Sequence, residues 1–266
     1  MSVLPSPLVS AAWLQAHMDD VRILDVRSME DYQRTHIHGA RWVSFDQLGT
    51  PSPHSGARRP LPAPVDFAAL MNDVGVHDQS LVVVYDDERG SHAARLWWML
   101  DSLGVSCGVL DGGIALWDGE RESGLSRRCE PSPAFTPRPW PRTHFIEADE
   151  VADDSQSALI LDARSAARFG GQESPLDPQP GHIPNAQSAP WTANCAEDGR
   201  LLPAPMLERR FGALGLEVGL PVHLYCGSGV TACHNALALR LLGVPARVYI
   251  GSWSEWASDP MRAVQN

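Results

Sequence analysis

Residues Ile23-Leu24-Asp25-Val26-Arg27 return later in the chain as Ile160-Leu161-Asp162-Ala163-Arg164, and this repeat is the strongest indication of the fold. A histidine-containing stretch follows each copy, His36-Ile37-His38-Gly39-Ala40 after the first and His182-Ile183-Pro184-Asn185-Ala186 after the second. An apolar run followed by a helical stretch ending in Leu-Gly-Val also recurs in the same order. An order of elements that occurs twice is typical of internal duplication. The sequence therefore predicts two copies of one domain.

Short apolar runs alternate with helical stretches within each copy. Leu81-Val82-Val83-Val84 is typical of a strand that is buried on both faces. This alternation predicts an α/β fold, with an open and mostly parallel sheet covered by helices in each copy. Five prolines fall within residues 131–141, a composition that cannot hold a helix or a central strand. We therefore predict domains over 1–125 and 144–266, joined by a Pro-rich linker over 126–143.

Composition excludes several classes of function. The chain has 266 residues, 44% of them apolar, a net charge of −11, and arginine at all 21 basic positions. Without lysine, neither a Schiff-base enzyme nor a lysine-bearing phosphate loop is available. Nucleic-acid binding is not expected either, since no dense basic stripe is present. No apolar run could span a bilayer and no secretory pattern opens the chain, so we predict a soluble, cytoplasmic protein without a membrane partner.

The cysteines are not spaced as a disulfide framework or a metal site. There are five, with no C-x-x-C pair and no ligand spacing with histidine. We expect free thiols, which suits a reducing compartment, and no metal or organic cofactor is implied. Four of them are expected to be small buried side chains, namely Cys107, Cys129, Cys195 and Cys233.

The fifth cysteine, Cys226, stands between a predicted strand and a predicted helix. Open α/β sheets bind their ligands at this edge. Gly227 and Gly229 let the backbone turn its N–H groups toward one spot, where the helix dipole adds positive potential. Val230 and Thr231 complete this loop. The loop should favour the thiolate that attacks sulfur, and should then hold the outer sulfur of a persulfide.

A phosphatase would use a similar cysteine loop, closed by an arginine that grips phosphate. The sixth residue after the cysteine is Ala232 here, and the next arginine is Arg240. The sequence therefore favours sulfur chemistry over phosphate hydrolysis.

Residues 226–233, read as CGSGVTAC, resemble the active-site signature of the 3-mercaptopyruvate sulfurtransferases, a branch of the tandem-domain rhodanese family. The resemblance extends over nearly the whole chain. It implies two rhodanese-like domains of which only the second is catalytic. In the first domain the equivalent strand is followed by Asp86, a carboxylate that cannot carry sulfur but could neutralise an anion-binding loop.

The resemblance also implies a mechanism. The Cys226 thiolate would take sulfur from 3-mercaptopyruvate as a persulfide, with the pyruvate enolate as leaving group. Ser228 matches the family's catalytic serine, and Asp46 matches an aspartate that supports it in a proton relay. Arg59 stands where relatives carry the histidine of that relay, so His54, five residues earlier, is the candidate.

Donor binding is matched in part. Arg168 corresponds to an arginine that binds the donor's carboxylate, a role suited to a planar and permanently charged fork. Asp177 stands nine residues later, where a second arginine is expected. The sequence thus predicts one arginine at the donor site. Thiosulfate-preferring relatives place a basic pair where this chain has Gly227 and Ser228, which favours 3-mercaptopyruvate.

Three functions remain open: 3-mercaptopyruvate sulfurtransferase, thiosulfate sulfurtransferase, and a non-enzymatic persulfide carrier or sensor. The first two take a small anionic sulfur donor and pass its sulfur to a thiol, cyanide or a thioredoxin-like protein. The Asp-x-Arg pairs at 25–27 and 162–164 occur in both copies. We therefore expect them, and His36 and His182 with them, to be structural.

Overall fold

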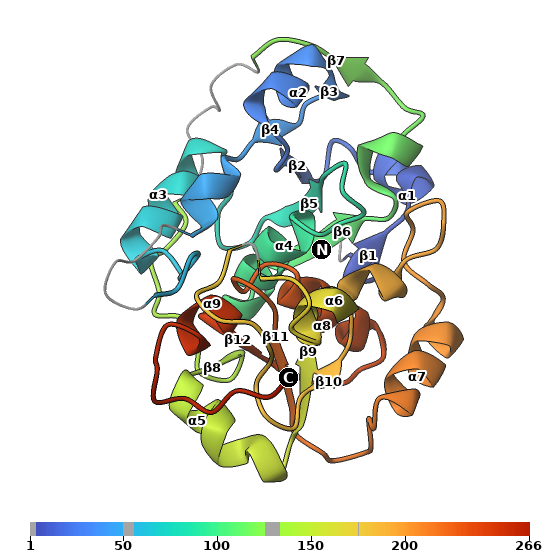
Figure 1. Ribbon diagram of the computed structural model, residues 1–266. Coiled ribbons are helices and arrows are strands. Elements are labelled where there is room, and N and C mark those ends of the chain that lie inside the picture. Colours follow the sequence, from blue (N-terminus) through green and yellow to red (C-terminus); the bar gives the residue numbers. More distant parts are fainter. Residues whose placement is uncertain (1–3, 50–55, 126–133, 175) are drawn as a thin grey trace. The chain divides into compact units, whose positions relative to one another are not determined.

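The computed structural model describes residues 4–49, 56–125, 134–174 and 176–266 (Figure 1). The chain divides into two compact units. Unit 1 consists of Met1–Leu48, Pro62–Pro141 and Glu197–Leu201, and unit 2 of Gly49–Leu61, Arg142–Ala196 and Leu202–Asn266. The domain boundaries at 125 and 144 stay a prediction.

Unit 1 is built around a five-stranded sheet with the order β1-β6-β5-β2-β4, in which every pairing is parallel. A separate antiparallel pair joins β3 to β7. The strands are β1 (Leu8–Val9), β2 (Arg22–Asp25), β3 (His36–Ile37), β4 (Arg41–Trp42), β5 (Leu81–Tyr85), β6 (Ser106–Leu110) and β7 (Arg121–Glu122). The helices are α1 (Ala11–Ala16), α2 (Met29–Arg34), η1 (Phe45–Leu48), α3 (Pro64–Asp73), α4 (Ala93–Ser102) and η2 (Gly113–Leu116).

Local sequence explains where several helices begin. A serine caps the N-terminus of three helices. In each case the serine hydroxyl accepts a hydrogen bond from the backbone N–H of the residue three positions later, as is common at helix starts. The serines are Ser10, Ser28 and Ser165. α3 and α7 instead carry a proline in their first turn, where its missing N–H is not needed.

The central strand β5 is buried on both faces, as its Val-Val-Val run predicts. Val83 and Tyr85 pack into one cluster with Ile23 of β2, and α4 packs on β5 and β6. Successive side chains of a strand point to opposite faces, so two layers of apolar contact hold this sheet.

Unit 2 has a second five-stranded sheet with the order β10-β9-β11-β12-β8, again parallel throughout. Its strands are β8 (Phe145–Ile146), β9 (Leu159–Asp162), β10 (Gln187–Ser188), β11 (Val222–Tyr225) and β12 (Arg247–Tyr249). Its helices are α5 (Ala148–Asp153), η3 (Asp154–Gln156), α6 (Ala166–Phe169), η4 (Trp191–Asn194), α7 (Ala204–Ala213), α8 (Ala232–Leu241) and α9 (Ser252–Trp256).

The two sheets have the same strand order when each strand is matched to its counterpart. β4, β2, β5, β6 and β1 of unit 1 correspond to β10, β9, β11, β12 and β8 of unit 2. The predicted α/β class with two tandem parallel sheets is therefore confirmed. Of the helices within the described ranges, none is long and apolar enough to cross a membrane.

The repeated Asp-x-Arg pairs form buried ion pairs in both units. Nη2 of Arg27 lies 2.6 Å from Oδ2 of Asp25, and the same atoms of Arg164 and Asp162 are also 2.6 Å apart. Burial opposes the charge of Arg164, but the Asp162 carboxylate outweighs it and raises the pKa of that guanidinium. The predicted structural role of these pairs is confirmed.

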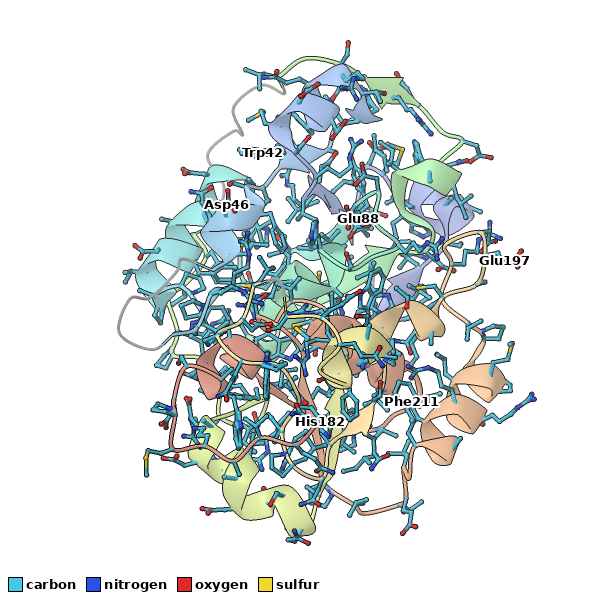
Figure 2. All side chains as sticks on the ribbon, in the orientation of Figure 1. Trp42, Asp46, Glu88, His182, Glu197 and Phe211 are labelled. Atoms are coloured by element: carbon cyan, nitrogen blue, oxygen red, sulfur yellow. The ribbon has the colours of Figure 1, made fainter. Side chains whose placement is uncertain are left out.

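The paired histidines are structural as well. Nδ1 of His36 is 2.8 Å from the carbonyl oxygen of Tyr32. Nδ1 of His182, a residue labelled in Figure 2, is 2.9 Å from the carbonyl oxygen of Phe169. Each ring also stacks on the aromatic ring of that same residue. These contacts anchor the turn that leads to the next strand of each sheet.

Candidate functional site

The loop 226–231 lies between β11 and α8, as the sequence predicts. Cys226 is buried, with 2% of its surface exposed. Its N–H donates to Oγ of Ser252 at 3.2 Å, and its carbonyl oxygen accepts the N–H of Trp253 at 2.9 Å. The first two residues of α9 thus bind both the N–H and the carbonyl oxygen of the cysteine.

The glycines of this loop are required by its surroundings. Gly229 has φ of +73°, and a Cβ there would strike the Ile250 carbonyl oxygen. A Cβ on Gly227 would lie 2.7 Å from Nη2 of Arg58 and 2.9 Å from Nη2 of Arg168. The loop therefore needs a residue that adopts a left-handed conformation at Gly229, and at Gly227 an added side chain would clash with two guanidinium groups.

The remaining loop residues lead into α8. Val230 is buried and Ser228 is half-buried, while Thr231 precedes the helix. The helix is buried on all sides from Ala232 to Leu239. Gly243 follows its end with φ of +71°, the expected left-handed stop.

Two arginines converge on Gly227, where the sequence predicted one. Nη2 of Arg168 lies 2.6 Å from Oδ2 of Asp177, and Nη1 of Arg58 pairs with the other oxygen of that carboxylate. Nη2 of Arg58 also donates to the carbonyl oxygen of Gly227 at 2.9 Å. The acidic residue at 177 thus brings a second guanidinium, from a distant segment, beside Arg168, and the role of either arginine in donor binding stays a prediction.

No sequence signal pointed to Arg58. It lies in the Pro/Ser/Gly-rich stretch before Pro60 and matches no residue of the signature discussed above. Only the folded chain brings it to the loop. Its backbone N–H donates to Oγ of Ser254 at 3.1 Å, and this bond ties the segment to the turn at α9.

The Nε atom of Arg168 is buried and has no hydrogen-bond partner among the described residues, although the same is true of Nε of Arg138. An unsatisfied buried donor costs about 1–3 kcal/mol, so such groups mark places where a ligand would complete the bonding. The position supports the predicted role of Arg168 in binding an anionic donor.

Unit 1 holds a carboxylate at the position equivalent to Cys226. Oδ1 of Asp86 accepts the N–H groups of Glu88 and Gly90 at 2.9 and 2.8 Å. Oδ2 accepts those of His92 and Ala93, both at 2.9 Å. This loop between β5 and α4 therefore gathers four backbone donors on one buried anion, as the strand–loop–helix arrangement predicts.

The predicted relay residues fall in different places. Asp46 lies in η1 of unit 1 and is exposed (Figure 2). Ser228 belongs to the loop in unit 2, and His54 lies outside the described residues. The relay stays a prediction.

Other thiols of unit 2 do not share the environment of Cys226. Sγ of Cys233 donates to the carbonyl oxygen of Gly229 at 3.3 Å, within a fully buried helix turn. Sγ of Cys195 lies 3.7 Å from Nε2 of His234. Cys107 of unit 1 is buried, and burial raises its pKa, which favours the inert thiol.

Among the described residues, no group of three or more His, Cys, Asp or Glu side chains could hold a metal ion.

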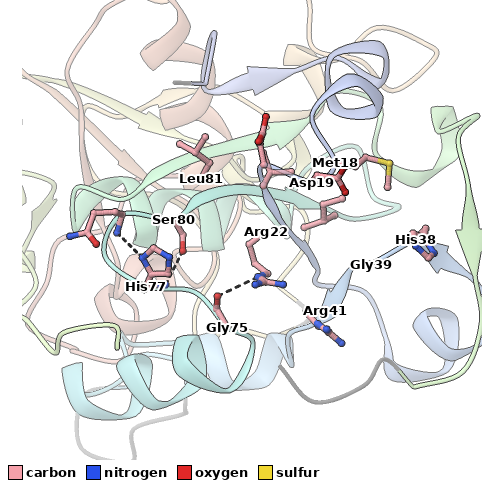
Figure 3. A pocket seen from close by; sticks show the side chains of 14 residues that line it. Met18, Asp19, Arg22, His38, Gly39, Arg41, Gly75, His77, Ser80 and Leu81 are labelled. Atoms are coloured by element: carbon pink, nitrogen blue, oxygen red, sulfur yellow. Dashed lines mark hydrogen bonds between the residues drawn. The ribbon is translucent and has the colours of Figure 1, made fainter. Parts of the chain in front are cut away.

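A pocket of about 500 Å³ lies elsewhere, in unit 1 (Figure 3). It is lined by residues at the starts of β2, β4 and β5, which is the opposite edge of the sheet from the Asp86 loop. Nε of Arg22 donates to the carbonyl oxygen of Gly75 at 3.3 Å, and Nδ1 of His77 accepts the N–H of Gln79 at 3.2 Å. These groups are bound to nearby backbone, so the loop in unit 2 is the better candidate site.

Comparison with known proteins agrees with this assignment. The family model described as a rhodanese-like domain matches residues 10–120 and again 147–259. A probable 3-mercaptopyruvate sulfurtransferase of Pseudomonas aeruginosa is 41% identical, over 97% of both chains. A thiosulfate sulfurtransferase of Gallus gallus is 31% identical over 94% of this chain and 92% of its own.

The fold agrees as well. The crystal structure of a 3-mercaptopyruvate sulfurtransferase from Escherichia coli superimposes with a TM-score of 0.78 and 34% identity, covering 93% of this chain and 99% of that one. Two matches to the domain model, together with relatives at this identity over nearly the full length, establish the family. The chain belongs to the rhodanese family and is a sulfurtransferase with two rhodanese-like domains.

Proposed function

We propose that this sulfurtransferase takes sulfur from 3-mercaptopyruvate as a persulfide on Cys226 and passes it to a thiol or to cyanide, releasing pyruvate. The observation that carries the proposal is the position of Cys226. It stands at the end of β11, where the equivalent loop of unit 1 surrounds the Asp86 carboxylate with four N–H donors. A sulfur anion in that position gains the same kind of stabilisation.

The first half-reaction transfers the donor's sulfur to the protein. The Cys226 thiolate attacks the thiol sulfur of 3-mercaptopyruvate, and a sulfur–sulfur bond forms as the carbon–sulfur bond breaks. The electron pair of the broken bond remains on carbon as the pyruvate enolate. A proton then converts this enolate to pyruvate, and the proposed source is the relay of Ser228, Asp46 and His54.

The second half-reaction returns the enzyme to its starting state. The acceptor anion attacks the outer sulfur of the persulfide, and the Cys226 thiolate leaves. Cyanide gives thiocyanate in this step, whereas a small thiol or a thioredoxin-like protein takes the sulfur as its own persulfide. The thiolate is a good leaving group in a loop that stabilises anions.

Two guanidinium groups beside Gly227 support an anionic donor. Arg168 and Arg58 are 21% and 29% exposed, so both can be reached from solvent. A bidentate bond from a guanidinium suits a carboxylate such as that of mercaptopyruvate. Thiosulfate is the second candidate donor, favoured by the thiosulfate sulfurtransferase among the relatives. The cytoplasmic location stays a prediction.

The test is steady-state kinetics with both donors, cyanide as acceptor, and detection of both pyruvate and thiocyanate. We expect faster turnover of 3-mercaptopyruvate and a loss of at least about 1,000-fold in Cys226→Ser, whose hydroxyl cannot form the persulfide. Faster turnover of thiosulfate would show that the donor is wrong. Retained activity in Cys226→Ser would overturn the mechanism. Persulfide formation without turnover of either donor would indicate a carrier.

The relay has its own test. Ser228→Ala should slow turnover of 3-mercaptopyruvate and spare that of thiosulfate, because only the enolate needs a proton. An equal loss with both donors would contradict the relay.

A further inference from the structure

Asp177 holds an unusual position in the candidate site. Its side chain is 1% exposed, and its two oxygens are paired with two different arginines. Both guanidinium groups extend over Gly227, the residue next to Cys226. Asp177 itself has no place in the proposed transfer of sulfur, yet it is the most deeply buried charge of this cluster.

The cluster carries a net charge of about +1. Arg58 and Arg168 contribute two positive charges, and Asp177 removes one. Two guanidinium groups side by side repel each other, so a shared carboxylate also keeps them together. The second bond of Arg58, from Nη2 to the Gly227 carbonyl oxygen at 2.9 Å, fixes this charge at the loop.

The two candidate donors differ in charge. 3-Mercaptopyruvate carries one negative charge on its carboxylate, whereas thiosulfate carries two. A change in the charge of the cluster therefore acts on thiosulfate about twice as strongly. At about 6 Å, with an effective dielectric constant of about 40, each pair of unit charges changes binding by about tenfold.

We propose that Asp177 is a positioning residue that sets the donor preference. By holding the arginine pair at a net charge near +1, it limits the advantage of dianionic donors over singly charged carboxylates. This inference rests on the proposed function, because it assumes that the donor binds beside Gly227. It concerns the choice of donor and leaves the chemistry at Cys226 unchanged.

The decisive variant is Asp177→Asn, which keeps the shape of the side chain and removes its charge. We expect the ratio of kcat/KM for thiosulfate to kcat/KM for 3-mercaptopyruvate to rise about tenfold. The rise should shrink as ionic strength increases, since screening weakens interactions with a solvent-accessible site. If Asp177 were purely structural, Asp177→Asn would lower kcat/KM for both donors equally. The ratio of the two kcat/KM values and its dependence on salt would then stay as in the wild type.

A matched control is Asp149→Asn in the same unit. Asp149 is 91% exposed and pairs with Arg262 at 2.6 Å, so this variant makes the same change in net charge on an exposed surface. It should leave the donor ratio as in the wild type. An equal shift in both variants would show that overall charge, rather than the arginine pair, sets the ratio.

Arg58→Gln provides an independent arm. It lowers the cluster charge while Asp177 keeps its pairing with Arg168, so the donor ratio should move about tenfold in the opposite direction. If a folded Asp177→Asn or Arg58→Gln protein shows an unchanged ratio, or if both ratios move the same way, the inference is wrong. Should the wild type turn over neither donor, the proposed function itself fails, a result distinct from either of these.

Discussion

The Asp86 loop of unit 1 and the Cys226 loop of unit 2 occupy the same place in two equivalent sheets. In unit 1 the first residue after β5 fills the loop with its own carboxylate, which accepts four backbone N–H groups. In unit 2 the corresponding residue is a cysteine with a small side chain, and arginines gather beside it. The difference shows that one loop position can hold a buried carboxylate in one copy and a thiol beside two guanidinium groups in the other.

The turn that faces each loop follows the same pattern. The N–H of Ile114 donates to the Asp86 carbonyl oxygen at 3.0 Å, and the N–H of Trp253 to that of Cys226 at 2.9 Å. The residue before each donor has a left-handed φ, +56° for Gly113 and +54° for Ser252. A serine in this conformation is strained, so its presence in unit 2 needs a local reason. The bond from the Cys226 N–H to its hydroxyl supplies that reason.

Among the variants that compare the two loops, the largest effect is expected where the Cys226 loop has no room for a side chain. Gly229→Ala must adopt φ near +73° and push against the Ile250 backbone, which would displace the loop. We expect kcat/KM to fall about 100-fold, the scale of a misplacement of about 1 Å. The control is Gly243→Ala, with φ of +71° and no atom within 4 Å of the added Cβ. It should lose only about 1–2 kcal/mol of stability and keep its activity; equal loss of activity in both variants would contradict the packing argument.

The next effect concerns the filled loop of unit 1. Asp86→Asn keeps the shape but turns an amide group toward donors that now have no acceptor. We expect the free energy of unfolding to fall by about 3 kcal/mol, because hydrogen bonds to charged groups are worth about 1.5–3 kcal/mol each. Chemical denaturation measures the change. The exposed neighbour gives the control: Asp87→Asn should be nearly neutral. A neutral Asp86→Asn would mean that the carboxylate contributes little to the loop.

A smaller effect tests the facing turn. Ser252→Gly makes this turn like that of unit 1, relieving strain while removing the acceptor of the Cys226 N–H. Relief of strain raises the free energy of unfolding and loss of the hydrogen bond lowers it, so we expect a net change within about 1 kcal/mol. The lost bond should still loosen the Cys226 backbone, so we expect a several-fold loss of kcat. Ser252→Ala keeps the strain and loses the bond, so it should be less stable than Ser252→Gly. The reverse order in thermal unfolding would refute this account of Ser252.

The smallest expected effect is a change in the pH dependence of stability, and it comes from the central strands of the two sheets. Val83 in β5 corresponds to His223 in β11, which is 1% exposed and bonds Asp154 through Nε2 at 2.9 Å. Burial lowers the pKa of His223 despite Asp154, with Arg247 also lowering it. A depressed histidine pKa gives stability that is present above its unfolded value near 6.5 and is lost as pH falls.

His223→Val should therefore flatten the pH dependence of stability below about pH 6.5. One proton changes the unfolding free energy by at most about 1.4 kcal/mol per pH unit, which bounds the effect. Denaturation curves between pH 7 and pH 5 would detect it. If the unfolding free energy of the variant depends on pH as steeply as that of the wild type, other groups cause the acid sensitivity. Val83→Ala is a control for altered packing, because it removes no titrating side chain.

Much of the fold could be predicted from short local patterns. The buried run at β5, the Asp-x-Arg pair after β2 and β9, and the cysteine–glycine loop before α8 all appear where expected. Each is specified by neighbours within a few residues, through burial, hydrogen bonding or turn geometry. The role of Asp86 as an internal anion could be inferred for the same reason.

The candidate site was less predictable because its charges come from distant segments. Reading Asp177 alone as a lost arginine missed Arg58, which no spacing rule links to residue 177 or 227. Ser252 had a faint signal, since the Gly112-Gly113 pair of the first copy returns as Gly251-Ser252. Its bond to the Cys226 backbone became visible only in three dimensions.

The two α/β copies, the family, and the copy in which a cysteine follows the central strand could all be predicted from the sequence, since these depend on residue type and near-neighbour order. The tertiary structure decided what surrounds that thiol: a buried carboxylate, two guanidinium groups and a strained serine, brought together from separate segments of one unit. The physical reason is range. Burial patterns and turn conformations are local properties of the chain, whereas the charge of a site is the sum over every group that folding brings within a few ångströms.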